Sequence, residues 1–206
     1  MRGFGLVELV VAMGIVAFVM MMAVPSFKSW TQNLQIRSDA EAIQNGLQYA
    51  RAEALRRNTT VRFQLMTTAD NNCAISTGQA SWVVNLGTQT TNDPTGLCAT
   101  AMPATVSQYV AADAPYILQK SSATTTPNVS VQSNGTPGNW MLVFGSLGQV
   151  VWPTNGPTQW DLSNPAAGAC ATSSAAGVTC MRINVSQNGR IRMCNPAQAA
   201  GSPQGC

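Results

Sequence analysis

Six cysteines are the residues whose spacing says most about chemistry in this chain. They stand at positions 73, 98, 170, 180, 194 and 206, and no two of them form a Cys-x-x-Cys pair. Because the chain contains no histidine, we expect no zinc or other metal site. An even number of cysteines indicates disulfides and an oxidising compartment. Joining nearest neighbours predicts one of several connectivities that six cysteines allow, with the pairs Cys73–Cys98, Cys170–Cys180 and Cys194–Cys206.

An apolar run near the start of the chain carries one charged side chain. Residues 4–24 contain only Glu8 among the acidic and basic types. At about 1.5 Å per residue, a helix of this run spans the roughly 30 Å hydrocarbon core of a bilayer. An ionisable group is costly there, so Glu8 indicates a function. The alternative is a plain anchor or a secretory signal peptide, although a signal peptide has a shorter apolar centre followed by a small-residue cleavage site.

Two alternating runs flank Asn188-Gly189 near the C-terminal end, which is a strong hairpin signal. A two-residue loop would mix arginine and aliphatic side chains on one face. A three-residue loop, 187–189, places Gly189 where a left-handed residue is needed. We prefer this loop because its inner face unites the apolar residues Ile183, Val185, Ile191 and Met193. The outer face then carries Arg182, Asn184, Ser186, Arg190 and Arg192.

The outer face of this hairpin could bind phosphate groups. Guanidinium groups match phosphate oxygens and require no particular base sequence. No acidic residue follows Asp161, so we expect no carboxylate near Arg182, Arg190 and Arg192. The alternative interpretation is that the arginines only keep an exposed strand face solvated. The net charge of +3 is by itself too small to indicate a nucleic-acid-binding protein.

The chain lacks the residue patterns of common catalytic sites. Without histidine, the usual acid–base and nucleophile–histidine arrangements cannot form. Acidic residues are scattered singly, and no glycine-rich phosphate loop follows a strand and opens a helix. We therefore expect a protein that is not an enzyme and that holds no cofactor.

A long helix is expected to organise these groups. Apolar residues recur at spacings of three and four and so share one helix face: Ala40, Ile43, Leu47, Ala50 and Ala54. Because this periodicity continues beyond Pro25, that proline should kink the helix rather than end it. Asn58 is the expected stop, after two arginines that suit the negative end of the helix dipole. Gly46 should weaken the helix by about 1 kcal/mol.

Strand signals dominate the rest of the chain. Short runs rich in β-branched and aromatic residues predict strands at 60–66, 81–86, 116–120, 128–132, 140–144, 149–152, 180–185 and 190–194. Residues 121–126 and 165–177 are polar or small and predict loops. A long helix followed only by strands indicates an α+β domain in which an antiparallel sheet packs on the helix.

The first residues carry a family resemblance. Residues 3–8 read Gly-Phe-Gly-Leu-Val-Glu and precede an apolar helix and Pro25, which resembles the class III leader of type IV prepilins and type II secretion pseudopilins. The resemblance implies that a prepilin peptidase cuts after Gly3 and methylates Phe4. It also implies that Glu8 seats the subunit in a filament. Gly5 stands where the family usually has threonine, and the leader has only residues 1–3.

Two further segments resemble the FimT, FimU and GspH group of minor pilins and pseudopilins. Residues 47–58 read LQYARAEALRRN and lead into a strand, as the helix end does in that group. Residues 189–192 read GRIR and match a GRxR element of the FimT branch, which contributes to DNA binding during natural transformation. The resemblance implies a pilin fold with a long kinked N-terminal helix, half of it transmembrane, on an antiparallel sheet.

The resemblance also implies an organisation of the chain. Residues 1–3 are the leader, 4–25 the transmembrane and assembly helix, 26–58 its amphipathic half, and 59–206 a disulfide-bearing periplasmic β domain. Arg2 favours a cytoplasmic N-terminus in the inner membrane, with the subunit later moving into a filament. Expected partners are other pilin subunits, prepilin peptidase and the inner membrane. The alternative function is capture of double-stranded DNA through the hairpin, and the choice between a type IV pilus and a secretion pseudopilus stays open.

Overall fold

The fold is described from a computed structural model of the 206-residue chain. It describes residues 5–76, 78–100, 114–122, 128–134, 140–154, 158–167, 170, 178–199 and 201–206. The side chains of residues 22–26, 134 and 167 fall outside this description. Gly3, Phe4 and the rest of the expected leader also lie outside the described residues.

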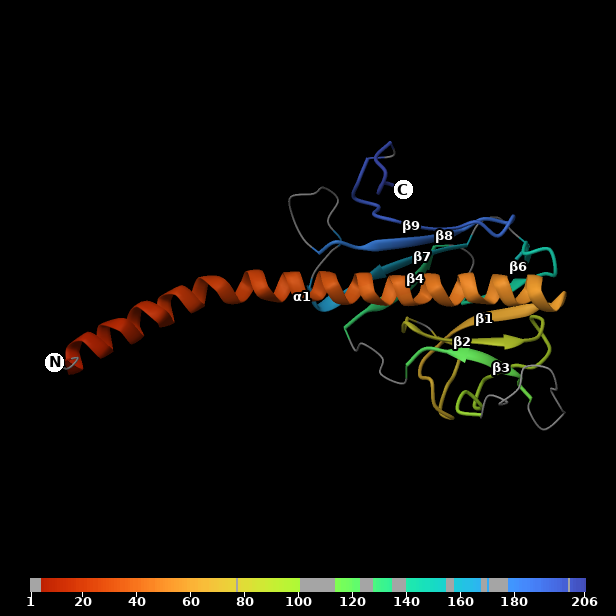
Figure 1. The fold of residues 1–206 in the computed structure, drawn as a ribbon, viewed down its shortest axis with the longest axis horizontal. Helices are drawn as coiled ribbons and strands as arrows, with labels where there is room; N and C mark the ends of the chain where they lie inside the picture. Colours follow the sequence, from red (N-terminus) through yellow and green to blue (C-terminus); the bar gives the residue numbers. More distant parts are fainter. Residues whose placement is uncertain are drawn as a thin grey trace.

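One helix, α1 (Leu6–Arg57), runs unbroken through Pro25 (Figure 1). Its N-terminal part projects beyond the strands and bends away from the axis of the remainder (Figure 1). The helix ends at Asn58, which has a left-handed backbone (φ 50°) and whose N–H donates to the carbonyls of Ala54 and Leu55. The predicted continuation past Pro25 and the predicted stop at Asn58 are confirmed.

The second half of α1 is buried along one face. Its inward side chains are fully buried: Ile36, Ala40, Ile43, Leu47, Ala50 and Ala54. We call the segment 36–54 the packed half. The predicted stripe is therefore the side of α1 that contacts the strands.

Within the described residues, nine strands form two antiparallel sheets beside the helix (Figure 1). The first sheet has the order β3-β2-β1-β5-β6, with β1 (Val61–Met66), β2 (Ser81–Leu86), β3 (Ile117–Lys120), β5 (Met141–Phe144) and β6 (Val150–Trp152). The second has the order β4-β7-β8-β9, with β4 (Ser130–Asn134), β7 (Thr158–Ser163), β8 (Met181–Val185) and β9 (Ile191–Cys194). A short 3-10 helix, Pro165–Ala167, follows β7. The α+β class is confirmed, whereas two sheets replace the one expected.

Strand β7 was not predicted. It lies between β4 and β8, and its alternate residues Thr158, Trp160 and Leu162 point inward and are buried. Its other residues are polar, so the run reads TQWDLS and lacks the β-branched character that marks the other strands. The predicted strands elsewhere match the observed ones to within about two residues, as expected for boundaries set by hydrogen bonding.

An aromatic cluster joins the helix and both sheets. Phe63 of β1 lies between Trp82 of β2 and Trp160 of β7, with ring centroids 5.7 Å apart in each pair. Gly46 of α1 faces this cluster, and a Cβ there would lie only 2.9 Å from the Phe63 ring and 3.0 Å from Trp82. The missing side chain of Gly46 therefore lets the rings approach the helix. The expected cost of Gly46 in helix propensity stays a prediction.

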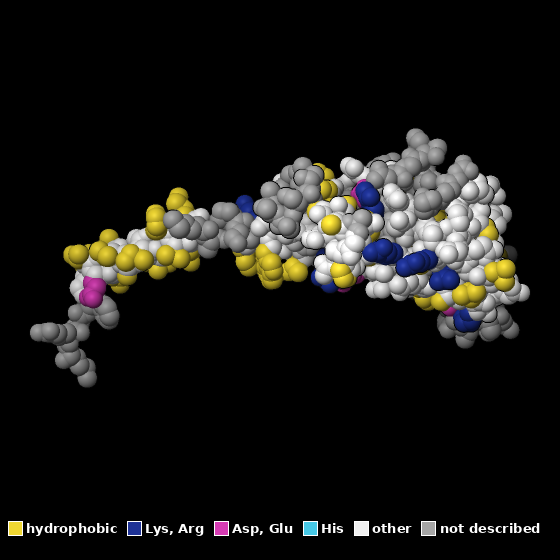
Figure 2. Space-filling model, turned by 90° about the horizontal axis from the view of Figure 1, so that it is seen from above, with side chains coloured by type: hydrophobic (Ala, Val, Ile, Leu, Met, Phe, Trp, Pro, Cys, Tyr) yellow, Lys and Arg dark blue, Asp and Glu magenta, His cyan; other side chains and the backbone are white. Residues whose placement is uncertain are grey.

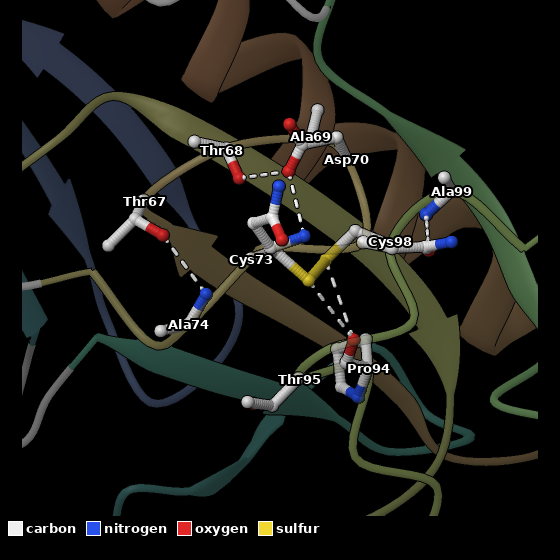
Figure 3. The surroundings of a disulfide bond; sticks show 12 residues. Thr67, Thr68, Ala69, Asp70, Cys73, Ala74, Pro94, Thr95, Cys98 and Ala99 are labelled. Atoms are coloured by element: carbon white, nitrogen blue, oxygen red, sulfur yellow. Dashed lines mark hydrogen bonds between the residues drawn. A yellow bond between two sulfur atoms is a disulfide. The ribbon is translucent and has the colours of Figure 1, made fainter.

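The six cysteines form Cys73–Cys98, Cys170–Cys180 and Cys194–Cys206, as nearest-neighbour pairing predicts. Figure 3 shows the first of these, which joins the loop after β1 to the loop after β2. Beside it, the Asp70 carboxylate accepts hydrogen bonds from the Thr68 hydroxyl (2.7 Å) and the Asn72 N–H (2.9 Å). These contacts hold the first loop next to the disulfide.

Candidate functional site: the free arm of the helix and the arginine hairpin

The first half of α1 exposes its apolar side chains. In residues 6–21, which we call the free arm, the large hydrophobic side chains are between 53% (Val16) and 82% (Leu6) exposed. Figure 2 shows them covering the arm on the face in view. An apolar surface this large on a soluble protein normally marks an interaction site.

Glu8 lies in the first turn of the free arm, where its carboxylate complements the positive end of the helix dipole. It is the one acidic residue among the apolar side chains of residues 6–21. Among the residues whose side chains are described, no helix is long and apolar enough to cross a membrane.

The C-terminal hairpin has the predicted three-residue loop. Strands β8 and β9 pair Val185 with Ile191 and Asn184 with Arg192, and the Ser186 N–H donates to the Arg190 carbonyl over 3.0 Å. Gly189 has a φ of 78°, the left-handed conformation that this loop requires. Ile183 and Val185 are buried, while Arg190 and Arg192 are exposed. The predicted register and the division of the two faces are confirmed.

A second turn holds the hairpin loop in place. A Cβ on Gly189 would overlap the Gly148 carbonyl oxygen, so glycine is required here for close approach as well as for its backbone conformation. The Val150 N–H donates to the Gln187 carbonyl over 2.9 Å, which links β6 to the loop. Arg51 of α1 donates from Nε to the same Gly148 carbonyl over 3.1 Å. The helix, the β5–β6 turn and the hairpin loop thus meet at one point.

The prediction that no carboxylate lies near the hairpin arginines was wrong. Asp161, on the unpredicted strand β7, accepts hydrogen bonds from Nε (2.6 Å) and Nη2 (2.8 Å) of Arg182. The bonds to Asp161 raise the pKa of the Arg182 guanidinium. Asp161 and Arg182 are directly opposite in the β7–β8 register. Arg182 therefore forms its ion pair within the domain, with Asp161.

Arg190 and Arg192 remain on the outer face. Nη2 of Arg192 donates a hydrogen bond to the Gly205 carbonyl over 2.6 Å. This bond orients the Arg192 side chain but does not neutralise its positive charge. Arg51 adds a third cation beside the loop, because its Nε lies 3.0 Å from the position of a Gly189 Cβ. Figure 2 shows Lys and Arg side chains in a row across this face. Sequence reasoning did not connect Arg51 with the hairpin, since the two are brought together only through Gly148.

The arginines that end α1 have structural partners. Glu53 is only 8% exposed and accepts hydrogen bonds from Arg56 (3.0 and 2.7 Å) and Arg57 (2.6 Å). The bonds from Arg56 contribute most to lowering the pKa of the Glu53 carboxyl, and burial opposes them. Residues 47–58, which carry the family resemblance, thus build the helix end and, through Arg51, its contact with the hairpin.

Comparison with known proteins concerns the family and the fold of the chain. The family model described as "Type II transport protein GspH" matches residues 39–189. The crystal structure of the type IV minor pilin FimU of Pseudomonas aeruginosa has 17% identical residues and a TM-score of 0.50, over 86% of this chain and 98% of that chain. A second crystal form of FimU gives 18% identity and a TM-score of 0.45, over 82% and 98%. No curated protein matched the sequence. At this level of identity, the likeness to FimU shows a shared fold.

Proposed function

Because the chain belongs to the GspH family of type II transport proteins, we propose that it is a structural minor pilin or pseudopilin subunit. In this proposal, the free arm packs among the apolar helices of neighbouring subunits, and the two sheets form the domain outside them. The observation that carries the proposal is the continuity of α1, which joins an exposed apolar arm to a fully buried stripe without a break.

The proposal includes maturation and a membrane stage. Prepilin peptidase would cut after Gly3 and methylate Phe4, and the inner membrane would hold residues 4–25 before assembly, with the domain in the periplasm. The disulfides support an oxidising compartment for the domain. Mass spectrometry of the mature chain tests this step: the N-terminal peptide should begin with N-methylated Phe4. An N-terminus at Met1 in assembled filaments would contradict it.

Glu8 provides the sharpest test of assembly. Its carboxylate is expensive in lipid and gains a favourable setting beside the positive N-terminal group of another subunit. Glu8→Ala should therefore remove the chain from sheared filaments while its amount in the membrane fraction is unchanged. The matched control is Glu41→Ala, because Glu41 lies on the same helix and forms an exposed ion pair with Arg37. Normal incorporation of the Glu8 variant would refute the proposal.

A second candidate function is binding of double-stranded DNA. Arg190 and Arg192 are exposed on one face, Arg51 lies beside them, and no ion pair to Arg190 or Arg192 occurs within the described part of the chain. Guanidinium groups so placed suit phosphate oxygens. Two or three phosphate contacts would give modest affinity and a log–log salt slope of about −2 to −3. Several copies in one filament would be needed for tight capture.

A gel-shift titration separates this candidate from the structural role. The full chain in detergent is compared with an Arg190→Gln/Arg192→Gln variant, which should lose most duplex affinity and flatten the salt slope by about 2. The control, Lys28→Gln/Arg37→Gln, removes the same charge from exposed sites on α1. Equal affinity of the hairpin variant and the original chain would reject DNA binding and leave the pilin proposal intact.

A further inference from the structure

An apolar patch lies on α1 between the free arm and the packed half. Phe27, Trp30 and Leu34 are 66%, 58% and 46% exposed, and their spacing of three and four places them on one helix face. The rings of Phe27 and Trp30 are 5.8 Å apart. Single exposed apolar residues are ordinary, whereas three adjacent large ones form a surface that is expected to have a partner.

A pocket of about 350 Å³ opens beside this patch. Helix α1 forms one wall, and strands β8 and β9 with the C-terminal loop form the other; the apolar part of the lining is Trp30, Leu34, Met181, Met193 and Pro203. This volume is at the lower end of the range of about 300–1,000 Å³ that binding pockets occupy. It can take an apolar side chain that projects from a partner.

The outer wall of the pocket is fixed in position. The C-terminal loop is closed by Cys194–Cys206 and held by the bond from the Asn195 N–H to the Gln204 carbonyl (2.7 Å). Arg192 adds the bond to the Gly205 carbonyl described above. At the rim, Arg37 is paired with Glu41 over 2.9 Å, so its charge is balanced locally. A preformed pocket whose surface is mainly apolar, with a charge at its rim that is already paired, favours an uncharged, protruding occupant.

We infer that this pocket receives an apolar side chain from the N-terminal helix of a neighbouring filament subunit. The inference rests on the proposed assembly function. Three observations select this occupant: the patch and the free arm lie on one helix, each copy of this chain brings an arm of exposed aliphatic side chains, and Glu8 is the one charged residue of that arm. A flat lipid surface covers Phe27 and Trp30 but cannot enter a pocket behind them.

Photo-crosslinking in filaments tests the inference. The crosslinker p-benzoylphenylalanine replaces Leu34 in the full chain, and the control carries it at Leu97, in the loop after β2, with the same exposure of 46%. After irradiation, the Leu34 adduct in sheared filaments should contain a peptide from the apolar N-terminal helix of a pilin subunit. The Leu97 site should give no such adduct.

The outcomes separate the inference from the proposed function. Adducts at Leu34 to lipid only, to the globular surface of another subunit, or to nothing in filaments that do contain the chain would overturn the pocket assignment alone. Absence of the original chain from filaments would overturn the proposed function.

A charge substitution measures how much the pocket contributes. Leu34→Asp should lower incorporation into filaments by about tenfold, the effect of losing one central contact residue. Leu97→Asp controls for the new charge, and the melting temperatures of the two variants should agree. Equal incorporation of both variants would contradict the inference.

Discussion

The two halves of α1 contain similar apolar residues in opposite surroundings. Leu9 in the free arm is 55% exposed, whereas Leu47 in the packed half is completely buried. The difference lies in what surrounds the apolar positions. In the packed half, polar residues such as Gln44 and Gln48 stand between the apolar residues. The apolar side chains therefore share one side of the helix, and the two sheets pack on that side. The arm is apolar around its circumference and therefore needs partners on several sides, which one domain of this chain does not supply.

The largest expected effect tests this contrast directly. Leu47→Ala should lower the free energy of unfolding by about 2–5 kcal/mol, since it leaves a cavity under both sheets. Leu9→Ala in the arm should change it by less than about 0.5 kcal/mol. Chemical denaturation of the two full-length variants in the same detergent measures both values. A loss at Leu9 as large as the loss at Leu47 would show that the arm folds back onto the domain.

The next effect concerns the ion cluster that ends the packed half. Glu53→Gln should lower the free energy of unfolding by about 1–3 kcal/mol, because it weakens charge-assisted bonds to Arg56 and Arg57 in a largely buried site. Glu41→Gln disrupts an exposed pair and should cost less than about 1 kcal/mol. If thermal unfolding shows the same loss of unfolding free energy in both variants, the burial of Glu53 adds nothing to stability.

The Glu53 cluster also predicts a pH dependence. The folded-state pKa of Glu53 is lowered, so near and below the ordinary carboxyl pKa the unfolded chain binds more protons than the folded chain. Stability therefore declines as the pH is lowered through this range. The stability that this group provides is complete above its unfolded pKa of about 4.3 and is lost as pH falls through the lower folded value. Denaturation midpoints measured down this range should decline more steeply for the original chain than for Glu53→Gln. Parallel curves would contradict the assignment.

The smallest effect separates the arginine of the hairpin that is paired with a carboxylate, Arg182, from the exposed Arg190. Asp161→Asn should lower the free energy of unfolding by about 1 kcal/mol, because Arg182 loses a paired carboxylate that is partly shielded from water. Arg190→Gln should change it by less than about 0.5 kcal/mol, since its side chain is exposed. A larger loss at Arg190 would mean that its guanidinium supports the fold and is not free to bind a ligand.

Periodic patterns made much of this fold predictable. The spacing of Ala40, Ile43 and Leu47 defined the buried side of α1, and the alternation around Gly189 was enough to choose the hairpin register. Both predictions depend on neighbours within a few residues. The pairing of the cysteines also followed short separations along the chain.

Contacts between distant segments could not be predicted in the same way. Asp161 faces Arg182 only because β7 pairs with β8, and β7 itself has too many polar residues to stand out. Arg51 meets the Gly148 carbonyl across 97 positions of sequence. The role of Gly46 depends on the rings of Phe63 and Trp82, which approach the helix where its side chain is missing. The candidate assembly residues Gly3, Phe4 and Glu8 remain predictions from the resemblance.

The unbroken course of α1 has a mechanical consequence. A pull on the arm along the helix axis reaches the sheets through the buried side chains between Ile36 and Ala54, which form a row along that axis. The buried contacts are then loaded in shear, and many must yield together before the helix slides. A pull across the axis would instead peel them away in turn. We therefore expect a single-molecule force measurement to find the domain stronger along α1 than across it, the direction in which a filament under tension would load it.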